Sequence, residues 1–360
     1  MIRKNMLIAF TVLLVLFLGL LRPSYGWDMI AYVAASYQQD GYKGSELSNK
    51  TYSAVKAEVS NEVFSELTKG NYKNRVYADP IALDQQIPMY SIKVVYVELM
   101  RCIHKVGIGY PKCSRLISAC FAALSVIILA RLIAKTQLPM ILLPIIVGLA
   151  GYILLAKLPT PDSISCFFSA WAILSLATKS KSNFVICVIL PFMRPDDILL
   201  SVLMMGFKFF EGSKWSSLIS LFISLIGYEC INKFAGNYGW LNLFNFSFIN
   251  IYTPYPANLV PSGRLDDYVR PYIAGVETLI TERFFIIYAL ALCLLWIFKT
   301  KIRFDRKFWI LFVIPLSFAA MHFVLFPDCE GRYFVFSTSI ICVWLFSFIK
   351  RVRETAPQSG

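Results

Sequence analysis

Charged residues and histidines are scarce in this sequence of 360 residues. Only 16% of the residues are charged and 57% are apolar, whereas an ordinary soluble domain is about 25% charged and about 45–50% apolar. Two histidines and no Cys-x-x-Cys pair give little with which to build a zinc site. A glycine-rich phosphate loop and a Gly-x-Ser-x-Gly motif are also missing, so nucleotide-driven transport and serine hydrolysis have no support. The composition instead favours a polytopic membrane protein.

Apolar segments recur along the whole chain, and a membrane-spanning helix needs about 20 apolar residues. Two of them, 183–193 and 198–210, are too short to cross alone and meet at Arg194-Pro195-Asp196-Asp197. Charged, irregular backbone at membrane depth is tolerated only where it is buried or lines a cavity. We therefore predict an all-α protein of about ten transmembrane helices, two of them broken passes beside a polar site. The segments are 6–21, 114–134, 138–156, 160–178, 183–193, 198–210, 215–231, 284–298, 308–326 and 333–349.

The positive charge falls unevenly on the two sides that ten passes define. The net charge is +13. With both termini inside, 16 of the 35 basic and three of the 22 acidic residues lie on the inner side, which leaves 19 of each sign outside. Basic residues collect in cytoplasmic loops as a consequence of membrane insertion. We therefore predict cytoplasmic termini, and the charge gives no reason to expect a nucleic-acid partner. The expected membrane is a bacterial inner membrane, with an endoplasmic-reticulum-like membrane as the alternative that the sequence leaves open.

Two outer segments of this single membrane domain (1–360) are much longer than the other connections, and long loops are usually functional. They are 22–113 and 232–283, while 299–307 is a basic cytoplasmic loop. In the first, apolar residues recur at helical spacing through 55–67 and 92–106, which predicts amphipathic helices in the membrane interface. The second is rich in aromatic residues, which suits either an interfacial belt or a lid over a lipid or sugar site.

Two features of the sequence allow more than one interpretation. The first apolar run is followed by Ser24-Tyr25-Gly26, so it is either a membrane helix or a cleaved secretory signal peptide. Most of the nine cysteines lie within apolar segments, where they pack as small apolar side chains. Cys102, Cys113 and Cys329 lie outside those segments, and the topology would permit one disulfide among these three.

Ionisable residues gather at the outer ends of the predicted passes, where charge is costly to keep out of water and a functional role is the default expectation. Long stretches of sequence separate them, yet the topology places them on one face of the membrane. They are Asp28, Lys93, Asp162, the pair Arg194 and Asp196, and Arg332 followed by Tyr333.

Each of these residues also has a purely structural explanation. Asp28 can cap a helix, and Asp162 after a proline has the pattern of a helix start. Arg194 can pair with a neighbouring aspartate, Arg332 can reach toward lipid head groups, and Lys93 can be a solvated charge. The functional interpretation therefore depends on their joint placement. Together they suit group transfer from an anionic lipid carrier, because a carboxylate can activate a hydroxyl and cations can stabilise a departing phosphate.

The order of these motifs resembles the GT-C superfamily, the integral-membrane glycosyltransferases that use polyprenyl-phosphate sugars. The likeness is closest to bacterial protein mannosyltransferases and aminoarabinose transferases. It begins with Asp28 after the first pass and continues through 90–99, which is similar to the Lys-Pro-Pro-Leu-Tyr stretch of the family. It also covers His104-Lys105-Val106-Gly107, Arg115-Leu116, Pro161-Asp162, Arg194-Pro195-Asp196 and Arg332-Tyr333.

The resemblance implies an inverting transferase with its active site outside the cytoplasm. Asp28 would be the base that activates the acceptor hydroxyl, and Asp162 would be a second acid near the site. Lys93 and Arg332 would bind the donor phosphate, with Arg194, Asp196 and Tyr333 as further substrate-binding positions. The partners would be a polyprenyl-phosphate-sugar donor and a glycan or lipid acceptor. Independently of the resemblance, further carboxylates at this face could hold a divalent cation through their oxygen atoms.

The sequence departs from the family pattern in two informative places. Val94 and Val95 replace the prolines after the lysine, which weakens the phosphate role of Lys93. Met29 follows Asp28 where protein mannosyltransferases have glutamate, which argues against a Ser/Thr protein mannosyltransferase.

An O-antigen or exopolysaccharide polymerase also fits about ten passes with large outer loops. A transporter or scramblase without enzymatic activity is the third interpretation, although its charges would be expected nearer the midplane of the passes.

Overall fold

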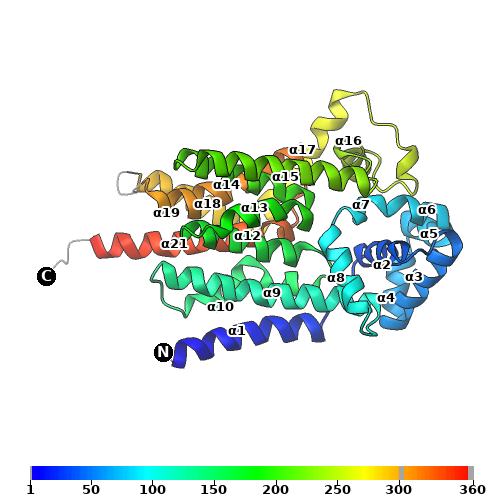
Figure 1. Ribbon diagram of the computed structural model, residues 1–360, viewed down its shortest axis with the longest axis horizontal. Helices are drawn as coiled ribbons and strands as arrows, with labels where there is room; N and C mark the ends of the chain where they lie inside the picture. Colours follow the sequence, from blue (N-terminus) through cyan, green and yellow to red (C-terminus); the bar gives the residue numbers. More distant parts are fainter. Residues whose placement is uncertain (1, 300–303, 356–360) are drawn as a thin grey trace.

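The computed structural model describes residues 2–299 and 304–355, and every regular element in those ranges is helical (Figure 1). The α-helices of the first half are α1 (Ile2–Leu21), α2 (Asp28–Gln39), α3 (Gly44–Glu58), α4 (Asn61–Thr68), α5 (Asn71–Ala78), α6 (Pro80–Gln86), α7 (Pro88–Ser91), α8 (Val94–His104), α9 (Tyr110–Lys135), α10 (Leu142–Ala150), α11 (Tyr152–Lys157) and α12 (Asp162–Ala177). Those of the second half are α13 (Ser182–Met193), α14 (Ile198–Phe210), α15 (Lys214–Phe234), α16 (Trp240–Phe244), α17 (Leu265–Thr281), α18 (Arg283–Ile297), α19 (Arg306–Phe308), α20 (Ile314–Leu325) and α21 (Val335–Thr355). Short 3₁₀ or π segments are η1 (Pro195–Asp197), η2 (Asn245–Ile249), η3 (Pro256–Asn258), η4 (Trp309–Val313) and η5 (Gly331–Phe334).

Most long helices run along the long axis of the molecule, and α1 begins at the end of this bundle where α21 finishes (Figure 1). Five helical segments are long and apolar enough to cross a membrane, or six if the bent pair α17 and α18 counts as one span. These features fit an integral membrane protein. Helices α12 and α13 are apolar but shorter than a full span.

Two of the predicted passes are interrupted. The run 138–156 is divided into α10 and α11 at Gly151, whose φ of 90° is left-handed and ends the first helix. The turn at Arg194 separates α13 from α14, as the sequence predicts for two short segments that meet at charged residues. Of the predicted basic loop 299–307, residues 300–303 lie outside the described ranges. Arg306 at its end donates from Nε to Glu211 at 2.5 Å.

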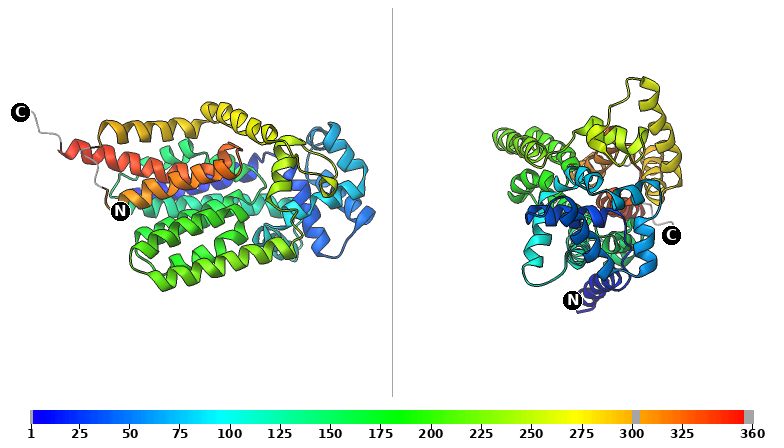
Figure 2. Two further views of the ribbon diagram at one scale, coloured as in Figure 1. Left: turned by 90° about the horizontal axis from the view of Figure 1, so that it is seen from above. Right: turned by 90° about the vertical axis from the view of Figure 1, so that its right-hand side faces the viewer.

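Helices α2 to α8 form a cap at one end of the bundle (Figure 2). Their apolar residues pack on one another around a separate core that includes Val33, Val55, Leu83 and Met100, all fully buried. The apolar faces predicted to lie in the membrane interface are therefore mostly covered by other parts of the protein, although Val106 at the end of the second stretch is 76% exposed. The periodic stretch 55–67 is also two helices, because Ser60 caps α4 by accepting a hydrogen bond from the Val63 amide.

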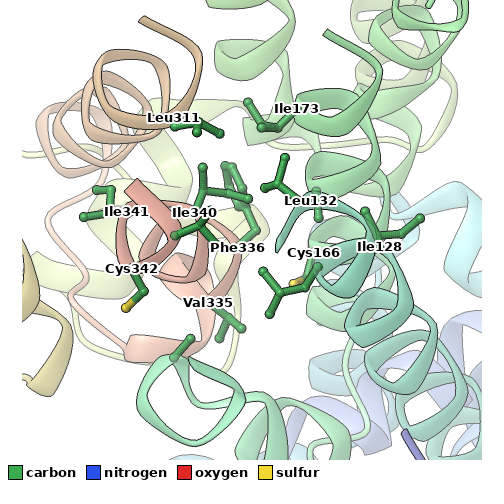
Figure 3. Close-up of a cluster of buried hydrophobic side chains, with 14 of the residues drawn as sticks. Ile128, Leu132, Cys166, Ile173, Leu311, Val335, Phe336, Ile340, Ile341 and Cys342 are labelled. Carbon is green, nitrogen blue, oxygen red and sulfur yellow. The ribbon is translucent and has the colours of Figure 1, made fainter. Parts of the chain in front are cut away.

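The core of the bundle lies where α9, α12, η4 and α21 meet. Figure 3 shows Leu132, Ile173, Leu311 and Ile340 from these four elements gathered at the centre of the core, with Cys166 beside them. Cys342 belongs to the same core but lies on another side of α21.

Cys166 and Cys342 are both buried, as is Cys187, which agrees with the prediction for cysteines in apolar segments. Cys120, Cys230 and Cys293 also lie in such segments but are exposed. All nine cysteines are free, so Cys102, Cys113 and Cys329 form no disulfide.

Helix α1 packs closely on the bundle through Gly19. A Cβ atom at this position would lie 2.7 Å from the carbonyl oxygen of Ala156 and 2.9 Å from the Cβ atom of Ala119. Only glycine allows the backbones of α1 and α11 to approach this closely. In this structure α1 is therefore packed against the bundle.

Adding a methyl group at Gly19 is expected to destabilise the protein. Gly19→Ala should cost about 1–3 kcal/mol, because the new Cβ meets backbone that cannot move aside cheaply. The matched control is Gly148→Ala, where a Cβ would meet nothing within 4 Å. Thermal unfolding of the purified variants in lipid nanodiscs measures both. An unchanged midpoint for Gly19→Ala would contradict the close packing of α1.

Candidate functional site

A cavity of about 470 Å³ lies where the cap joins the bundle, and every predicted site residue lines it. Asp28 begins α2, Lys93 precedes α8, and Asp162 begins α12. The break between α13 and α14 supplies Arg194 and Asp196. The segment η5 supplies Arg332 and Tyr333. Residues separated by up to about three hundred positions in the sequence therefore line one cavity.

Asp28 links α2 of the cap to the 3₁₀ segment η5. Its Oδ2 atom accepts from Arg332 Nη1 at 3.0 Å, and its Oδ1 atom accepts from the Tyr90 hydroxyl at 3.1 Å. No side-chain capping bond is formed at the start of α2. The alternative that Asp28 serves as a helix cap is therefore not what the structure shows. With its side chain about one-third exposed, the carboxylate still faces the cavity.

Asp162 is buried between two guanidinium groups. Its Oδ1 atom pairs with Arg194, and its Oδ2 atom accepts from the Thr160 hydroxyl at 2.7 Å. The Nε atom of Arg332 lies 3.6 Å from the same Oδ2 atom. A buried carboxylate with three partners fixes the positions of the arginines. Its oxygen atoms are occupied, so it is poorly placed to accept a proton from a ligand.

Arg194 continues the network toward α20. It donates from Nε and Nη2 to the two oxygens of Asp196, at 3.1 and 3.0 Å. His322 lies 3.3 Å from the same carboxylate through Nε2 and is almost fully buried. Pairing of Arg194 with a neighbouring aspartate is thus present, as one interpretation proposed, but the same arginine also holds Asp162.

The ring of Tyr333 lies against both arginines. The guanidinium carbons of Arg194 and Arg332 are 4.4 and 4.9 Å from its centroid, and Arg332 Nη2 donates to its hydroxyl at 2.9 Å. Aromatic faces attract cations and restrict the plane of a guanidinium. Two bidentate donors are therefore held in fixed orientations beside the cavity.

Lys93 differs from the arginines because no carboxylate among residues 2–299 and 304–355 lies within ion-pair distance of it. Its ammonium donates to the Met89 carbonyl at 2.7 Å and lies 5.6 Å from the centre of the Tyr90 ring. Burial, followed by the charge of Arg194, lowers the pKa of Lys93 to about 8. This cation has spare hydrogen-bonding capacity and faces the cavity, which is what an anionic ligand needs.

Two more acids, Asp328 and Glu330, line the cavity in the turn that precedes η5. Glu330 pairs with Arg332 at 2.5 Å, and Asp328 accepts from the Glu330 amide at 3.1 Å. Burial raises the pKa of both carboxyl groups. These acids can accept hydrogen bonds from the hydroxyl groups of a ligand.

Several cavity residues lie outside the predicted set. Tyr90 and Thr160 are polar neighbours of the predicted aspartates that carry no charge to mark them. His322 could have been predicted from the sequence, because an ionisable residue within an apolar segment is a functional candidate by default. Aromatic residues of the second long loop also line the cavity, which favours the lid interpretation. They are Trp240, Phe246, Phe248 and Tyr252.

The second loop is fastened to the cap. The Tyr255 hydroxyl donates to Asp79 at 2.5 Å and accepts from Arg75 Nε at 3.1 Å. The Gln86 side chain donates to the Pro254 carbonyl at 3.0 Å. These bonds hold the aromatic segment 240–252 against the cavity.

The carboxylates of the cavity do not form a metal site in this arrangement. Within the described parts of the chain, no three His, Cys, Asp or Glu side chains come together as a set of metal ligands. Arginine occupies the oxygens of Asp28, Asp162 and Asp196 that a cation would need. The residues present therefore do not fit a bound divalent cation.

Comparison with known proteins yields no relative. The chain matches no family model, and neither a curated protein nor a solved structure is detectably similar to it.

Proposed function

We propose that this protein is an inverting membrane glycosyltransferase of the GT-C kind. It would transfer a sugar from a polyprenyl-phosphate carrier to a hydroxyl group of a glycan or lipid. In this proposal about ten passes cross a bacterial inner membrane, with both termini in the cytoplasm and the cavity on the outer side. The observation that carries the proposal is a carboxylate and an unpaired lysine facing one cavity.

Each part of the cavity supports one step of this reaction. Asp28 takes the proton of the acceptor hydroxyl, whose oxygen forms a bond to the anomeric carbon. The bond from that carbon to the phosphate oxygen breaks, and the phosphate leaves with the electron pair. Lys93 and the free donor capacity of Arg332 stabilise the charge that develops on the phosphate.

We assign Asp162 a positioning role in place of an acid role. Its oxygens are taken by Arg194, Arg332 and Thr160. By neutralising and orienting both guanidinium groups, it keeps them available to the ligand without excess positive charge in the buried site.

The cavity also has an apolar side that suits a polyprenyl chain. Ile198 and Leu199 at the start of α14, and Leu243 of α16, line it opposite the charged wall. A carrier entering from the bilayer would place its phosphate at the charged wall and its hydrocarbon along these residues.

The activity is tested by release of the carrier, because this readout needs no knowledge of the acceptor. The purified protein in nanodiscs is incubated with individual polyprenyl-phosphate sugars and a membrane glycolipid extract, and mass spectrometry measures free polyprenyl phosphate. Release from one donor, dependent on the extract, is the expected result. Growth of a product ladder from pyrophosphate-linked repeats would indicate a polymerase, and movement of lipid without release would indicate a scramblase.

Donor binding is expected to weaken as the pH rises through about 8, because the pKa of Lys93 is lowered to about 8 by burial. The ammonium is present below this pH and is lost above it, whereas the phosphodiester of the donor stays anionic. The dissociation constant should therefore rise between pH 7 and pH 9. Lys93→Arg should remove this dependence, since arginine stays charged throughout. An unchanged constant across this range in the wild type would contradict the phosphate role of Lys93.

A further inference from the structure

Helix α17 presents three different faces. Five apolar residues fall within an arc of about 80° at 3.6 residues per turn, and their side chains are 45–77% exposed. These are Leu265, Val269, Ile273, Val276 and Ile280. Exposed charged residues, Asp266, Arg270 and Glu277, occupy the adjacent arc. The remaining face, with Pro271 and Gly275, is buried against the protein.

The direction of α17 suits a helix lying along a membrane surface. It meets α18 at an angle of 82° across a break of one residue. In the right-hand view of Figure 2, down the long axis, α17 is seen lengthwise at the edge of the molecule, while many bundle helices are seen end-on. If α18 crosses the bilayer, α17 therefore runs nearly parallel to the bilayer plane.

We propose that α17 lies in the membrane interface at the cavity end of the bundle, with its apolar stripe in the lipid. The occupant of the stripe is the bilayer because α17 directly precedes α18, and the two helices together are apolar enough to be a membrane span bent at their junction. The stripe is also separated from the charged arc along the whole helix. That separation is what a boundary between hydrocarbon and water selects.

The buried face of α17 holds the turn that carries Asp328 and Glu330. The Tyr272 hydroxyl donates to the Val324 carbonyl at 2.6 Å, and Cys329 Sγ lies 3.3 Å from the Gly275 carbonyl. A Cβ atom at Gly275 would lie 2.7 Å from the Pro327 carbonyl oxygen. The lipid-seated helix thus positions one wall of the cavity, a consequence that matters for catalysis only if the proposed function holds.

Seating in lipid is tested without any enzyme assay. An environment-sensitive fluorescent amino acid replaces Ile273 in one variant and Glu277 in the other, and both are reconstituted in nanodiscs. Brominated lipids should quench position 273 several-fold more strongly than 277, and aqueous iodide should show the reverse. Equal quenching of both positions by iodide would overturn the proposal. Shielding of 273 from both quenchers, dependent on protein concentration, would also overturn it by indicating a second copy.

The contact with the turn is tested by Gly275→Val, with Gly275→Ala as the milder variant. Hydrogen exchange at residues 326–333 should become at least several-fold faster in Gly275→Val, while the probe at 273 stays quenched by brominated lipid. Gly263→Val is the matched control, since a Cβ there meets nothing within 4 Å. Unchanged exchange in both Gly275 variants would overturn the positioning of the turn. Loss of the proposed transferase activity would leave these two readouts unaffected.

Discussion

Asp28→Asn is expected to lower sugar transfer by about a hundred- to ten-thousandfold, the range for loss of a general base. Asparagine keeps the size of the side chain and can still accept from Arg332, but it cannot take the proton of an acceptor hydroxyl. The rate of carrier release, compared with wild type at saturating donor, measures the effect. Donor affinity should change much less than the rate, because Asp28 does not contact the phosphate in the proposed arrangement.

The matched control for Asp28→Asn is Asp266→Asn, which removes an exposed carboxylate on α17. It should transfer sugar at the wild-type rate and unfold at the wild-type temperature. Full activity of Asp28→Asn would refute its role as the base. A loss of activity accompanied by unfolding would point instead to a structural role in joining α2 to η5.

Asp162→Asn is expected to destabilise the protein by about 1.5–3 kcal/mol, because it removes a charged acceptor shared by two buried guanidinium groups. Arg194 keeps Asp196 as a partner, and Arg332 keeps Asp28 and Glu330. Each guanidinium would nevertheless lose a charged, buried acceptor that no other carboxylate replaces at that position. Thermal unfolding in nanodiscs measures the change.

The control for Asp162→Asn is a substitution of a less buried acid, Glu211, which should destabilise the protein less. Glu211 pairs with Lys208 and Arg306 at the opposite end of the bundle, and its side chain is 24% exposed against 4% for Asp162. Glu211→Gln should cost about 1 kcal/mol or less, as partly exposed pairs do. Equal midpoints for the two variants would contradict the buried, shared position of Asp162.

Helical fold and site location follow from different signals in the sequence. The helices follow from long apolar runs, which is why most of the predicted segments correspond to helices. Interruptions within apolar sequence are harder to predict. Gly151 lies in an unbroken apolar run, and only its left-handed backbone reveals the break. The packing of the cap was not predictable, because an amphipathic helix has the same pattern whether lipid or another helix covers its apolar face.

The charged part of the site was predictable because ionisable residues at the ends of apolar segments are costly and few. The fold brings Asp28, Lys93 and Arg332 to one cavity although the sequence separates them widely. The pairing pattern was not predictable. The sequence does not show that Asp162 is shared between two arginines, or that Lys93 has no carboxylate within ion-pair distance in the described part of the chain. Both depend on distances that are set by the packing of α2, α12 and η5.

Binding of a lipid-linked phosphate to Lys93 tests the proposed site most directly. Thermal unfolding is measured in nanodiscs containing undecaprenyl phosphate or its sugar-loaded forms, for wild type, Asp28→Asn and Lys93→Met. A ligand that binds only the folded protein raises the unfolding temperature according to its concentration and affinity. We expect one sugar-loaded monophosphate to stabilise wild type and Asp28→Asn, with a much smaller shift for Lys93→Met. Absence of a shift with every monophosphate carrier, or an equal shift in all three proteins, would contradict the proposed donor site.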